Sequence, residues 1–387
     1  MSPEPTRREA RHTQLWDCPE AVRKRPGMYV GSTGERGLHQ LVLEAADPAV
    51  NEALTRRASG VEITFMPDSG VRVADERPGV PFEAGGDGGG PGLEAMLTGL
   101  MMSEGSGGAR YAVLNQYGTG LAIVNALSSR LVVEVQRGGV RRVQEYARGV
   151  ASAPPADAGS AVGSGTVITF WPDAEIFETT ECSFAELAER FRELTFLNRG
   201  LEVLLTDDRL SEARSVRFRA PGGVRDLVAF LDEQAGAPVD SEAIGFERED
   251  PRMAGTMEVA LRWRGSGKGW VRSFANSRPT PGGGTHLVGL HEGVGAALSA
   301  YARERRLLTA TDPDFGTELI GRGLTAVVSV KLEHPEFLGS TRGVLGNAAA
   351  HTCVRQAVQE FLGGWLAEHP QRAVDVVDRI MQGTRQN

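Results

Sequence analysis

One glutamate and one glycine-containing turn are the features of this sequence that could most directly take part in catalysis or ligand binding. Glu44 lies in the run LVLEAADPAVNEAL, and a carboxylate that stays ionised and faces a pocket can act as a general base. The run NQYGTGLAIVNALS places Gly118 and Gly120 before an apolar helix, where backbone N–H groups can approach a phosphate. Taken alone, a helical glutamate is usually a solvated side chain and a GxG run is weak evidence, so neither feature identifies a function.

The elements that hold these residues follow from the spacing of apolar side chains. Apolar residues recur at helical spacing over residues 37–54, which predicts a helix that carries Glu44. The segments VEITFMP and GVRVADE, joined by a turn at residues 67–70, are typical of two strands, the second ending near Asp75. Four more strands are predicted for SRLVVEVQRG, GVRRVQEYARG, GTVITFWPD and LEVLLTDDR. An amphipathic helix is predicted for FAELAERFRELTFLNRG.

A second half begins after a rise in polarity over residues 207–223 that ends in APGG. A length of 387 residues also favours two domains. The second half contains three predicted helices, VRDLVAFLDEQ, GTHLVGLHEGVGAALSAYARER and AAAHTCVRQAVQEFLGGWLAEH, and three predicted strands, MEVALRWRG, KGWVRSFANS and TAVVSVKL. Helices and strands mix in both halves without a strict βαβ alternation, which favours an α+β fold over a doubly wound sheet.

Composition narrows the class of protein. The shares of hydrophobic (41%) and charged (24%) residues are those of a soluble globular protein, and no apolar run is long enough to cross a bilayer. The polar N-terminus lacks the apolar stretch of a signal peptide, so we expect a cytoplasmic protein without a membrane partner. Three widely spaced cysteines without a CxxC pair argue against a zinc site or a disulfide framework and favour buried thiols.

A net charge of −8 argues against a stand-alone nucleic-acid-binding protein. A local basic patch remains open, because net charge does not describe the distribution of charge. Its candidates are Arg137, Arg141, Arg142 and Arg148, for which a solvated strand face is the favoured interpretation.

The run VRKRPGMYVGSTGERGLHQLVLEAAD, at residues 22–47, closely resembles the opening of the gyrase B and topoisomerase IV ATPase subunits. Four further runs resemble the same family in the same order: GTVITFWPD, LAERFRELTFLNRG, GGGTHLVGL and GLTAVVSVKLEHPEF. The resemblance covers nearly the whole chain. The polar residues 1–16 are expected to form a flexible arm. The resemblance implies a Bergerat-type α/β sandwich, as in gyrase, Hsp90, histidine kinases and MutL, at residues 17–220. A transducer domain with a ribosomal-protein-S5-like fold is implied for residues 221–387.

The resemblance also implies an activity and partners. Family members bind ATP with Mg²⁺, and ATP dimerises two such chains around a DNA segment. The sequence stops where the transducer domain is expected to end, without a Toprim region and its EGDSA-like acidic motif. We therefore expect no DNA cleavage by this chain alone and only indirect contact with DNA. A homodimer, or association with gyrase subunits, is the expected assembly.

On the helix, Glu44 matches the family's general base, which polarises the attacking water. One turn later the family carries an asparagine that binds Mg²⁺, and Pro48 stands there without a side-chain oxygen. Asp47 and Asn51 are the nearest substitutes. We assign Asp47 to the nucleotide site and no residue as a metal ligand. Because proline inside a helix costs about 3 kcal/mol, the helix is predicted to kink, or to end and restart with Asp47 as its cap.

On the adenine side, Asp75 matches the aspartate that accepts a hydrogen bond from the adenine amino group. Gly79 matches a glycine where the backbone passes close to the base, although the usual DDGRGIP reads DERPGVP here. Gly165 and Thr166 match an adenine-side pair, and this pair is intact. Arg137 matches an arginine at the pocket rim that aminocoumarin antibiotics contact.

On the phosphate side, a GGxHGVG-like lid in the family is replaced by LNQYGTG, which keeps Gly118 and Gly120. Asn125 is retained from the helix that follows the lid. The family's QTK loop reaches from the transducer domain and its lysine touches the γ-phosphate. Here the loop reads STR at residues 340–342, so Arg342 keeps the charge with a different shape, and we assign it, with Glu44, to the catalytic residues.

Two functions remain open at this point. The first is an ATP-hydrolysing topoisomerase module, and the second is a weak or inactive pseudo-ATPase that acts as a dimerisation or regulatory partner of gyrase. The loss of the asparagine at Pro48 and the reduced lid favour the second. A histidine kinase is a weaker third interpretation, because kinases lack a transducer-like half.

Overall fold

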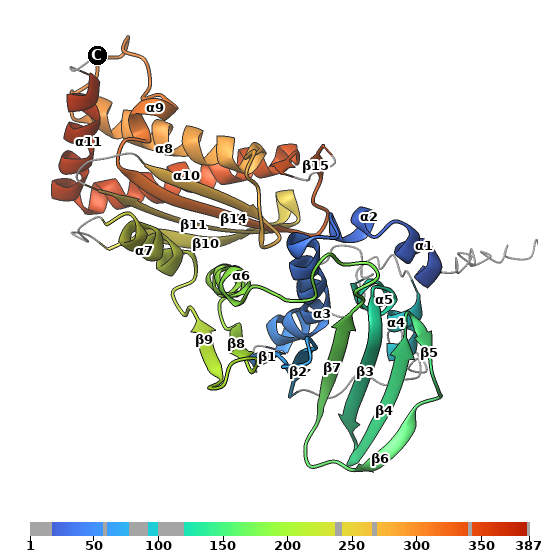
Figure 1. The fold of residues 1–387 in the computed structure, drawn as a ribbon. Coiled ribbons are helices and arrows are strands. Elements are labelled where there is room, and N and C mark those ends of the chain that lie inside the picture. The colour runs from blue at the N-terminus through green and yellow to red at the C-terminus, as the bar shows by residue number, and fades with distance from the viewer. Residues whose placement is uncertain are drawn as a thin grey trace, which may run out of the picture.

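The computed structural model describes residues 18–56, 60–76, 92–99, 120–236, 242–264, 269–339 and 343–384, which form two halves, each with its own sheet (Figure 1). In the first half, nine strands form one sheet in the order β5-β4-β3-β7-β2-β1-β8-β9, and β6 also pairs with β4. Their bounds are β1 (Gly60–Phe65), β2 (Val71–Asp75), β3 (Ser128–Arg137), β4 (Val140–Ala147), β5 (Val150–Ala151), β6 (Ala156–Ser160), β7 (Gly165–Pro172), β8 (Glu202–Asp207) and β9 (Arg214–Arg219). All neighbouring strands are antiparallel except β1 and β8, which are parallel.

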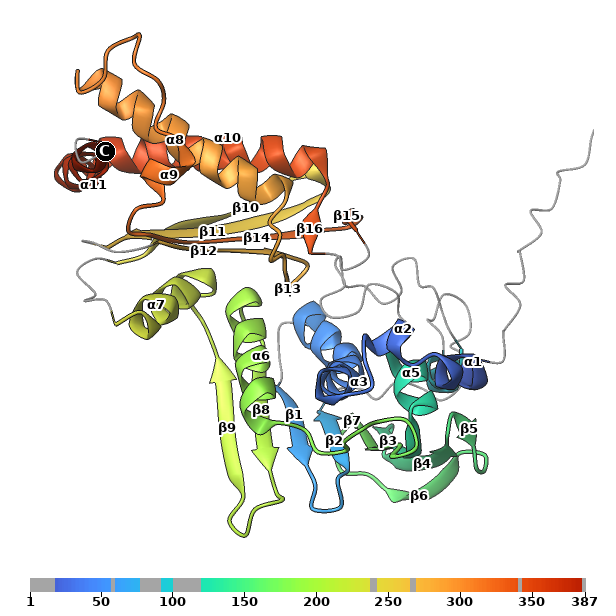
Figure 2. The same ribbon diagram turned by 45° about the horizontal axis from the view of Figure 1, so that its top comes forward.

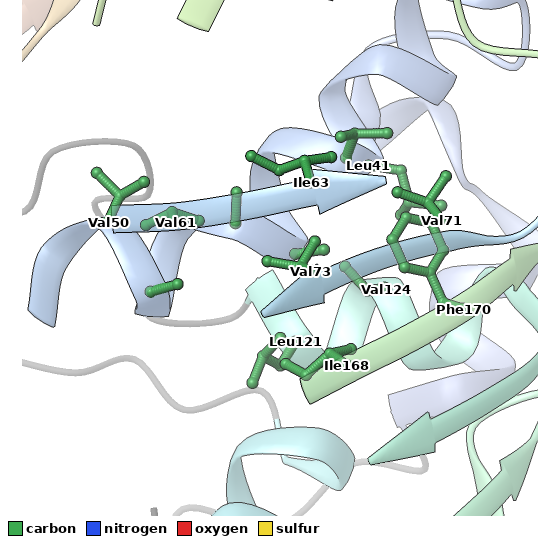
Figure 3. Packing of buried hydrophobic residues seen from close by; sticks show 14 of the residues in the cluster. Leu41, Val50, Val61, Ile63, Val71, Val73, Leu121, Val124, Ile168 and Phe170 are labelled. Atoms are coloured by element: carbon green, nitrogen blue, oxygen red, sulfur yellow. The ribbon is translucent and has the colours of Figure 1, made fainter. Parts of the chain in front are cut away.

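Helices cover one face of this sheet. They are α1 (Cys18–Lys24), α2 (Gly27–Val30), α3 (Glu35–Arg56), α4 (Leu93–Thr98), α5 (Gly120–Ala126) and α6 (Phe184–Leu197). The alternation of apolar and polar residues along β1, β2 and β7 directs one set of side chains toward α3 and α5. Figure 3 shows the resulting core, with side chains from β1, β2 and β7 meeting Leu41 and Val50 of α3 and Leu121 and Val124 of α5.

The second half is a sheet with helices on both faces (Figure 2). Its strands have the order β10-β11-β14-β12-β13, with β12 parallel to β14. Their bounds are β10 (Ile244–Asp250), β11 (Gly255–Trp263), β12 (Trp270–Ala275), β13 (Arg278–Pro279) and β14 (Leu324–Leu332). Helices α8 (Thr285–Glu304) and α10 (Ala348–Glu368) pack on one face over an apolar core, and α7 (Val224–Gln234) packs on the other.

The smaller elements of the second half lie around this layer. They are the 3-10 helix η1 (Pro251–Met253), α9 (Thr317–Ile320), α11 (Pro370–Thr384), and the two-stranded pair β15 (Phe337–Leu338) and β16 (Val344–Leu345). Helices α8 and α10 approach each other closely. A Cβ on Gly289 would lie only 2.5 Å from the His351 carbonyl oxygen. A Cβ on Gly293 would lie 2.7 Å from the Arg355 carbonyl oxygen, so glycine at both positions permits the contact.

In helix α3 the structure overturns a prediction. It runs unbroken from Glu35 to Arg56 with Pro48 inside it, so the alternative in which the helix ends and restarts at Asp47 is wrong. Buried residues continue on both sides of the proline, for example Ala45 and Ala49. This continuous packing against β1, β2 and α5 offsets the cost of one missing backbone hydrogen bond.

The structure also contains elements that the sequence patterns did not predict. The polar stretch at residues 207–223 holds an edge strand, β9, and the chain passes from β9 to α7 through residues 220–223. Helices α1, α2 and α11 were not predicted either. Cys182 and Cys353 are buried, and burial raises the pKa of their thiols to about 12 and about 11. Within the described ranges, no helix is long and apolar enough to span a bilayer.

Candidate functional site

Three of the predicted adenine-side residues meet where β2 ends and β7 begins. Asp75 is the last residue of β2 and stands directly opposite Thr166 of the antiparallel strand β7. A Cβ on the neighbouring Gly165 would lie 2.4 Å from the Asp75 carbonyl oxygen, closer than any side chain tolerates. Glycine is therefore required for β7 to pass this close to the end of β2. We call Asp75, Gly165 and Thr166 the β2–β7 cluster.

Arg137 lies at the same edge of the sheet. It is the exposed last residue of β3, and its neighbour Gln136 pairs with Gly165 of β7. The strand register thus puts Arg137 at the edge where β7 begins, and its role at a pocket rim stays a prediction. The other three arginines of the candidate basic patch form ion pairs: Arg141 with Glu134, Arg142 with Asp157, and Arg148 with Glu175 and Asp173. Paired arginines on a strand face agree with the solvated-surface interpretation.

Glu44 lies on the buried side of α3 with only 7% of its surface exposed. Its Oε1 accepts a hydrogen bond of 2.6 Å from Nε2 of Gln40, one turn earlier in the same helix. The sequence analysis missed Gln40, although the i, i+4 spacing to Glu44 was a usable signal. The glutamine fixes the direction of the carboxylate without neutralising its charge, which suits a group that must keep one defined orientation.

The residues that follow Glu44 on this side of α3 include few metal ligands. Asp47 is buried, and Pro48 and Asn51 are half-buried at the next turn. Magnesium prefers several oxygen ligands in octahedral geometry, and Pro48 offers none. Among the residues that the structure describes, no group of three or more His, Cys, Asp and Glu side chains is placed to share a metal ion. Pro48 therefore contributes no ligand, and Asp47 and Asn51 are the oxygen-bearing side chains next to it on this helix.

The start of α5 brings two further predicted residues into the fold. Gly120 is its buried first residue, and Asn125 is fully buried five residues later. Asn125 donates a hydrogen bond of 2.9 Å from Nδ2 to the Leu97 carbonyl oxygen at the end of α4. Within the described part of the chain, its Oδ1 receives no hydrogen bond. Asn125 thus connects α5 to α4, a contact that the sequence did not indicate.

Three predicted site residues lie outside the described residues. They are Gly79 in the stretch after β2, Gly118 in the stretch before α5, and Arg342 between β15 and β16. Their roles stay predictions.

The RKRPGM run itself has a structural contact that the sequence analysis did not anticipate. Arg23 donates to the Ala126 carbonyl oxygen at 2.9 Å and to Oδ2 of Asp173 at 2.7 Å. Burial alone would raise the pKa of Asp173, but a backbone N–H from Glu175 and the nearby Arg23 and Arg148 lower it below its usual range. The ionised Asp173 thus holds α1 against the end of α5.

Comparisons with known proteins agree with this arrangement. A family model described as DNA gyrase B matches residues 223–387. The DNA gyrase B protein of Streptomyces coelicolor is 42% identical over 380 residues, which cover 94% of this chain and 55% of that protein. The chain thus spans about half the length of the curated relatives it matches.

Solved structures show the same similarity in three dimensions. The 43K ATPase domain of Thermus thermophilus gyrase B, in complex with an aminocoumarin, superposes with a TM-score of 0.80 at 31% identity, covering 95% of this chain and 94% of that one. The topoisomerase IV ATP-binding domain of Francisella tularensis has a TM-score of 0.74 at 25% identity, covering 95% and 98%. These matches confirm the predicted α+β fold class, a Bergerat-type sandwich followed by a transducer domain.

Proposed function

This chain belongs to the DNA gyrase B family, and from that premise we propose that it is the ATP-binding module of a type II DNA topoisomerase. The observation that carries the proposal is the β2–β7 cluster. In this cluster Asp75 lies opposite the start of β7, where only glycine at position 165 permits the close approach of the two strands. Arg137 lies at the same edge of the sheet. A hydrogen-bonding edge of this kind suits a planar base, and the buried Glu44 of α3 is proposed to serve the phosphate chain.

The division into domains at residue 220 is part of this proposal. The last strand of the first sheet ends at Arg219, and α7, which packs on the second sheet, begins at Val224. Residues 17–220 are assigned to nucleotide binding and residues 221–387 to the transducer domain.

In the adenine half of the site, the Asp75 carboxylate accepts a hydrogen bond from the exocyclic amino group of adenine. Gly165 lets the start of β7 pass close to the end of β2, and Thr166, opposite Asp75, supplies a hydroxyl. Arg137 at the rim contributes a positive charge near the entrance. Asn125 is also assigned to the nucleotide site, and its hydrogen bond to the Leu97 carbonyl oxygen joins α5 to α4.

In the phosphate half, Glu44 is the general base. Its carboxylate, oriented by Gln40, takes the proton of the water that attacks the γ-phosphorus, and the bond to the β-phosphate oxygen breaks to release ADP and phosphate. A bound Mg²⁺ would neutralise the charge that develops on the phosphate oxygens. Asp47 is the nearest buried carboxylate to the missing ligand, and it is assigned to this half of the site.

A second candidate function is a weak or inactive pseudo-ATPase that acts as a dimerisation or regulatory partner of gyrase. The observation that favours it is Pro48, inside an unbroken helix at the position of the metal ligand. Phosphoryl transfer depends on stabilising charge, so this loss is expected to affect hydrolysis much more than adenine binding.

One titration separates the two functions. A fluorescent non-hydrolysable ATP analogue is titrated into the full chain with Mg²⁺ and with a chelator. Binding that Mg²⁺ strengthens supports the ATPase, and binding that ignores Mg²⁺ supports the pseudo-ATPase. A chain that binds the analogue in neither condition, while it remains folded by circular dichroism, would overturn both.

The assembly is proposed from the family alone, because the chain spans 55% of the Streptomyces coelicolor relative. We propose a nucleotide-dependent homodimer or an association with gyrase subunits. Light scattering after gel filtration, with and without the analogue, distinguishes a homodimer from a monomer. A pull-down with purified gyrase subunits tests the second assembly, and a monomer that retains none of them counts against the proposal.

A further inference from the structure

The junction between the two halves brings together three arginines and one glutamate. Helix α6 supplies Arg190 and Glu193, β12 supplies Arg272, and β13 begins with Arg278. Figure 2 shows the end of α6 reaching toward β13 beneath the second sheet. We call these four residues the junction cluster.

The contacts of the junction cluster cross from one half to the other. Glu193 Oε1 lies 2.5 Å from Arg190 Nη1, and Glu193 Oε2 lies 2.6 Å from Arg272 Nη2. Arg190 also donates a 3.0 Å hydrogen bond to the Ser277 carbonyl oxygen, directly before Arg278. A single carboxylate therefore serves two guanidinium groups. Among the described residues, Arg278 forms no ion pair and no side-chain hydrogen bond.

The cluster carries an excess of two positive charges at a partly buried position. Only 21% of the Arg190 side chain and 12% of the Glu193 side chain are exposed. Burial lowers the pKa of Arg190, the positive charges of Arg278 and Arg272 lower it further, and Glu193 acts in the opposite direction. Like charges held together away from water cost free energy unless an anion joins them.

A neighbouring ion cluster shows that this imbalance is local. On the same face of the second sheet, Arg199 pairs with Glu247 and with Glu258, and Lys331 also acts on Glu258. Two positive and two negative side chains balance there. The sheet face is thus not basic throughout.

We propose that the junction cluster binds a phosphate group and so connects the two halves of the chain through an anion. Guanidinium groups are the side chains best suited to phosphate, because their planar N–H groups match its oxygens in pairs. The group can come from free phosphate or from the backbone of a nucleic acid, which offer the same oxygens. The inference does not depend on the nucleotide site, since none of its four residues belongs to that site.

Thermal unfolding of the full chain tests free phosphate as the source. Sodium phosphate replaces sodium chloride at constant ionic strength, so that general screening does not change. Phosphate at ten times its Kd is expected to raise Tm by roughly 2–4 °C. Arg278→Gln should abolish most of this rise. Glu193→Gln frees two guanidinium groups, so its rise should be larger than that of the unmodified chain.

Arg142→Gln is the matched control, because Arg142 is a surface arginine with one ion pair to Asp157 and lies far from the junction in sequence and sheet. It removes the same charge and should keep the full response to phosphate. Equal responses in Arg278→Gln and Arg142→Gln would show that free phosphate binds elsewhere, for example at the nucleotide site. That result would contradict free phosphate as the ligand of the junction cluster.

Fluorescence anisotropy with a labelled DNA duplex tests the second source. If the ligand is a nucleic-acid backbone, Arg278→Gln should weaken DNA binding. The slope of log affinity against log salt concentration should then fall by about one phosphate contact. A phosphate-dependent rise in Tm without this effect assigns the site to free phosphate. If Arg278→Gln behaves like Arg142→Gln in both measurements, the proposal is wrong.

Discussion

The adenine side and the phosphate side of the candidate site are built in different ways. The β2–β7 cluster is fixed by the register of two paired strands and by a close backbone approach at Gly165. The phosphate side depends on side chains of α3, and its loop residues Gly118 and Arg342 lie outside the described residues, as does Gly79 of the adenine side. Strand register tolerates changes in neighbouring side chains, whereas a metal site is lost with a single oxygen. The comparison therefore predicts a chain that keeps nucleotide binding more readily than hydrolysis.

The largest expected effect is on turnover. Glu44→Gln removes the proposed general base while it keeps the size of the side chain and a hydrogen-bonding partner for Gln40. We expect ATP turnover to fall by about 10²–10⁴-fold, with nucleotide affinity changed by less than about threefold. Steady-state phosphate release and the analogue titration measure the two quantities.

Glu62→Gln, on the exposed face of β1, is the control for the charge change and should leave turnover unaltered. Turnover that survives in Glu44→Gln would show that another group activates the water. A chain without measurable turnover before substitution would instead support the pseudo-ATPase.

The second effect is on affinity. Asp75→Asn replaces the carboxylate proposed to accept the adenine amino hydrogen by an amide of the same size. A hydrogen bond to a charged group contributes about 1.5–3 kcal/mol, so we expect affinity for the ATP analogue to fall by about 10–150-fold. The same loss should occur with and without Mg²⁺, because the adenine side does not touch the metal. Asp157→Asn on the exposed strand β6 is the control, and equal affinities in the two variants would remove Asp75 from the site.

The third effect concerns the close approach of β7 to β2. Gly165→Ala places a Cβ 2.4 Å from the Asp75 carbonyl oxygen, so the strands must separate. We expect a destabilisation of about 1–3 kcal/mol, seen as a lower Tm, and a loss of roughly tenfold in analogue affinity. In Gly60→Ala the new Cβ meets only an ordinary 3.5 Å contact with the Glu202 carbonyl oxygen, so both quantities should change little. Unchanged affinity in Gly165→Ala would mean that the nucleotide does not contact this edge.

The same contrast decides how much of the fold was predictable from the sequence. Helix α7 and strand β14 were predicted to within one residue, because their apolar periodicity is regular and their burial complete. Strand β9 was missed because its run RSVRFR lies at a sheet edge and is mostly exposed, so little apolar alternation remains. Helix α11 was missed because only one narrow stripe of it is buried, although that stripe has helical spacing.

The site follows the same division. Sequence motifs placed Asp75, Gly165 and Thr166 together, and the strand register brings them together. They did not predict the hydrogen bond from Gln40 to Glu44, or the contact from Asn125 to α4. Both depend on how helices rotate and pack, which local patterns leave undetermined. At Pro48 the local pattern was misleading. Proline disfavours a helix interior, but the packing of α3 on both sides of Pro48 keeps the helix continuous.

The smallest effect is the most specific test of the comparison. Pro48→Asn restores an oxygen one turn after Glu44, and we expect Mg²⁺ to strengthen analogue binding by a few-fold, up to about tenfold. Removing proline from the interior of α3 should also raise Tm, since proline there costs up to about 3 kcal/mol relative to alanine. Pro48→Ala also removes the proline but carries no side-chain oxygen. Only the difference between the two variants in their response to Mg²⁺ therefore shows whether the asparagine oxygen binds the metal. If they respond alike, the phosphate side lacks more than one ligand, and the contrast with the adenine side extends beyond Pro48.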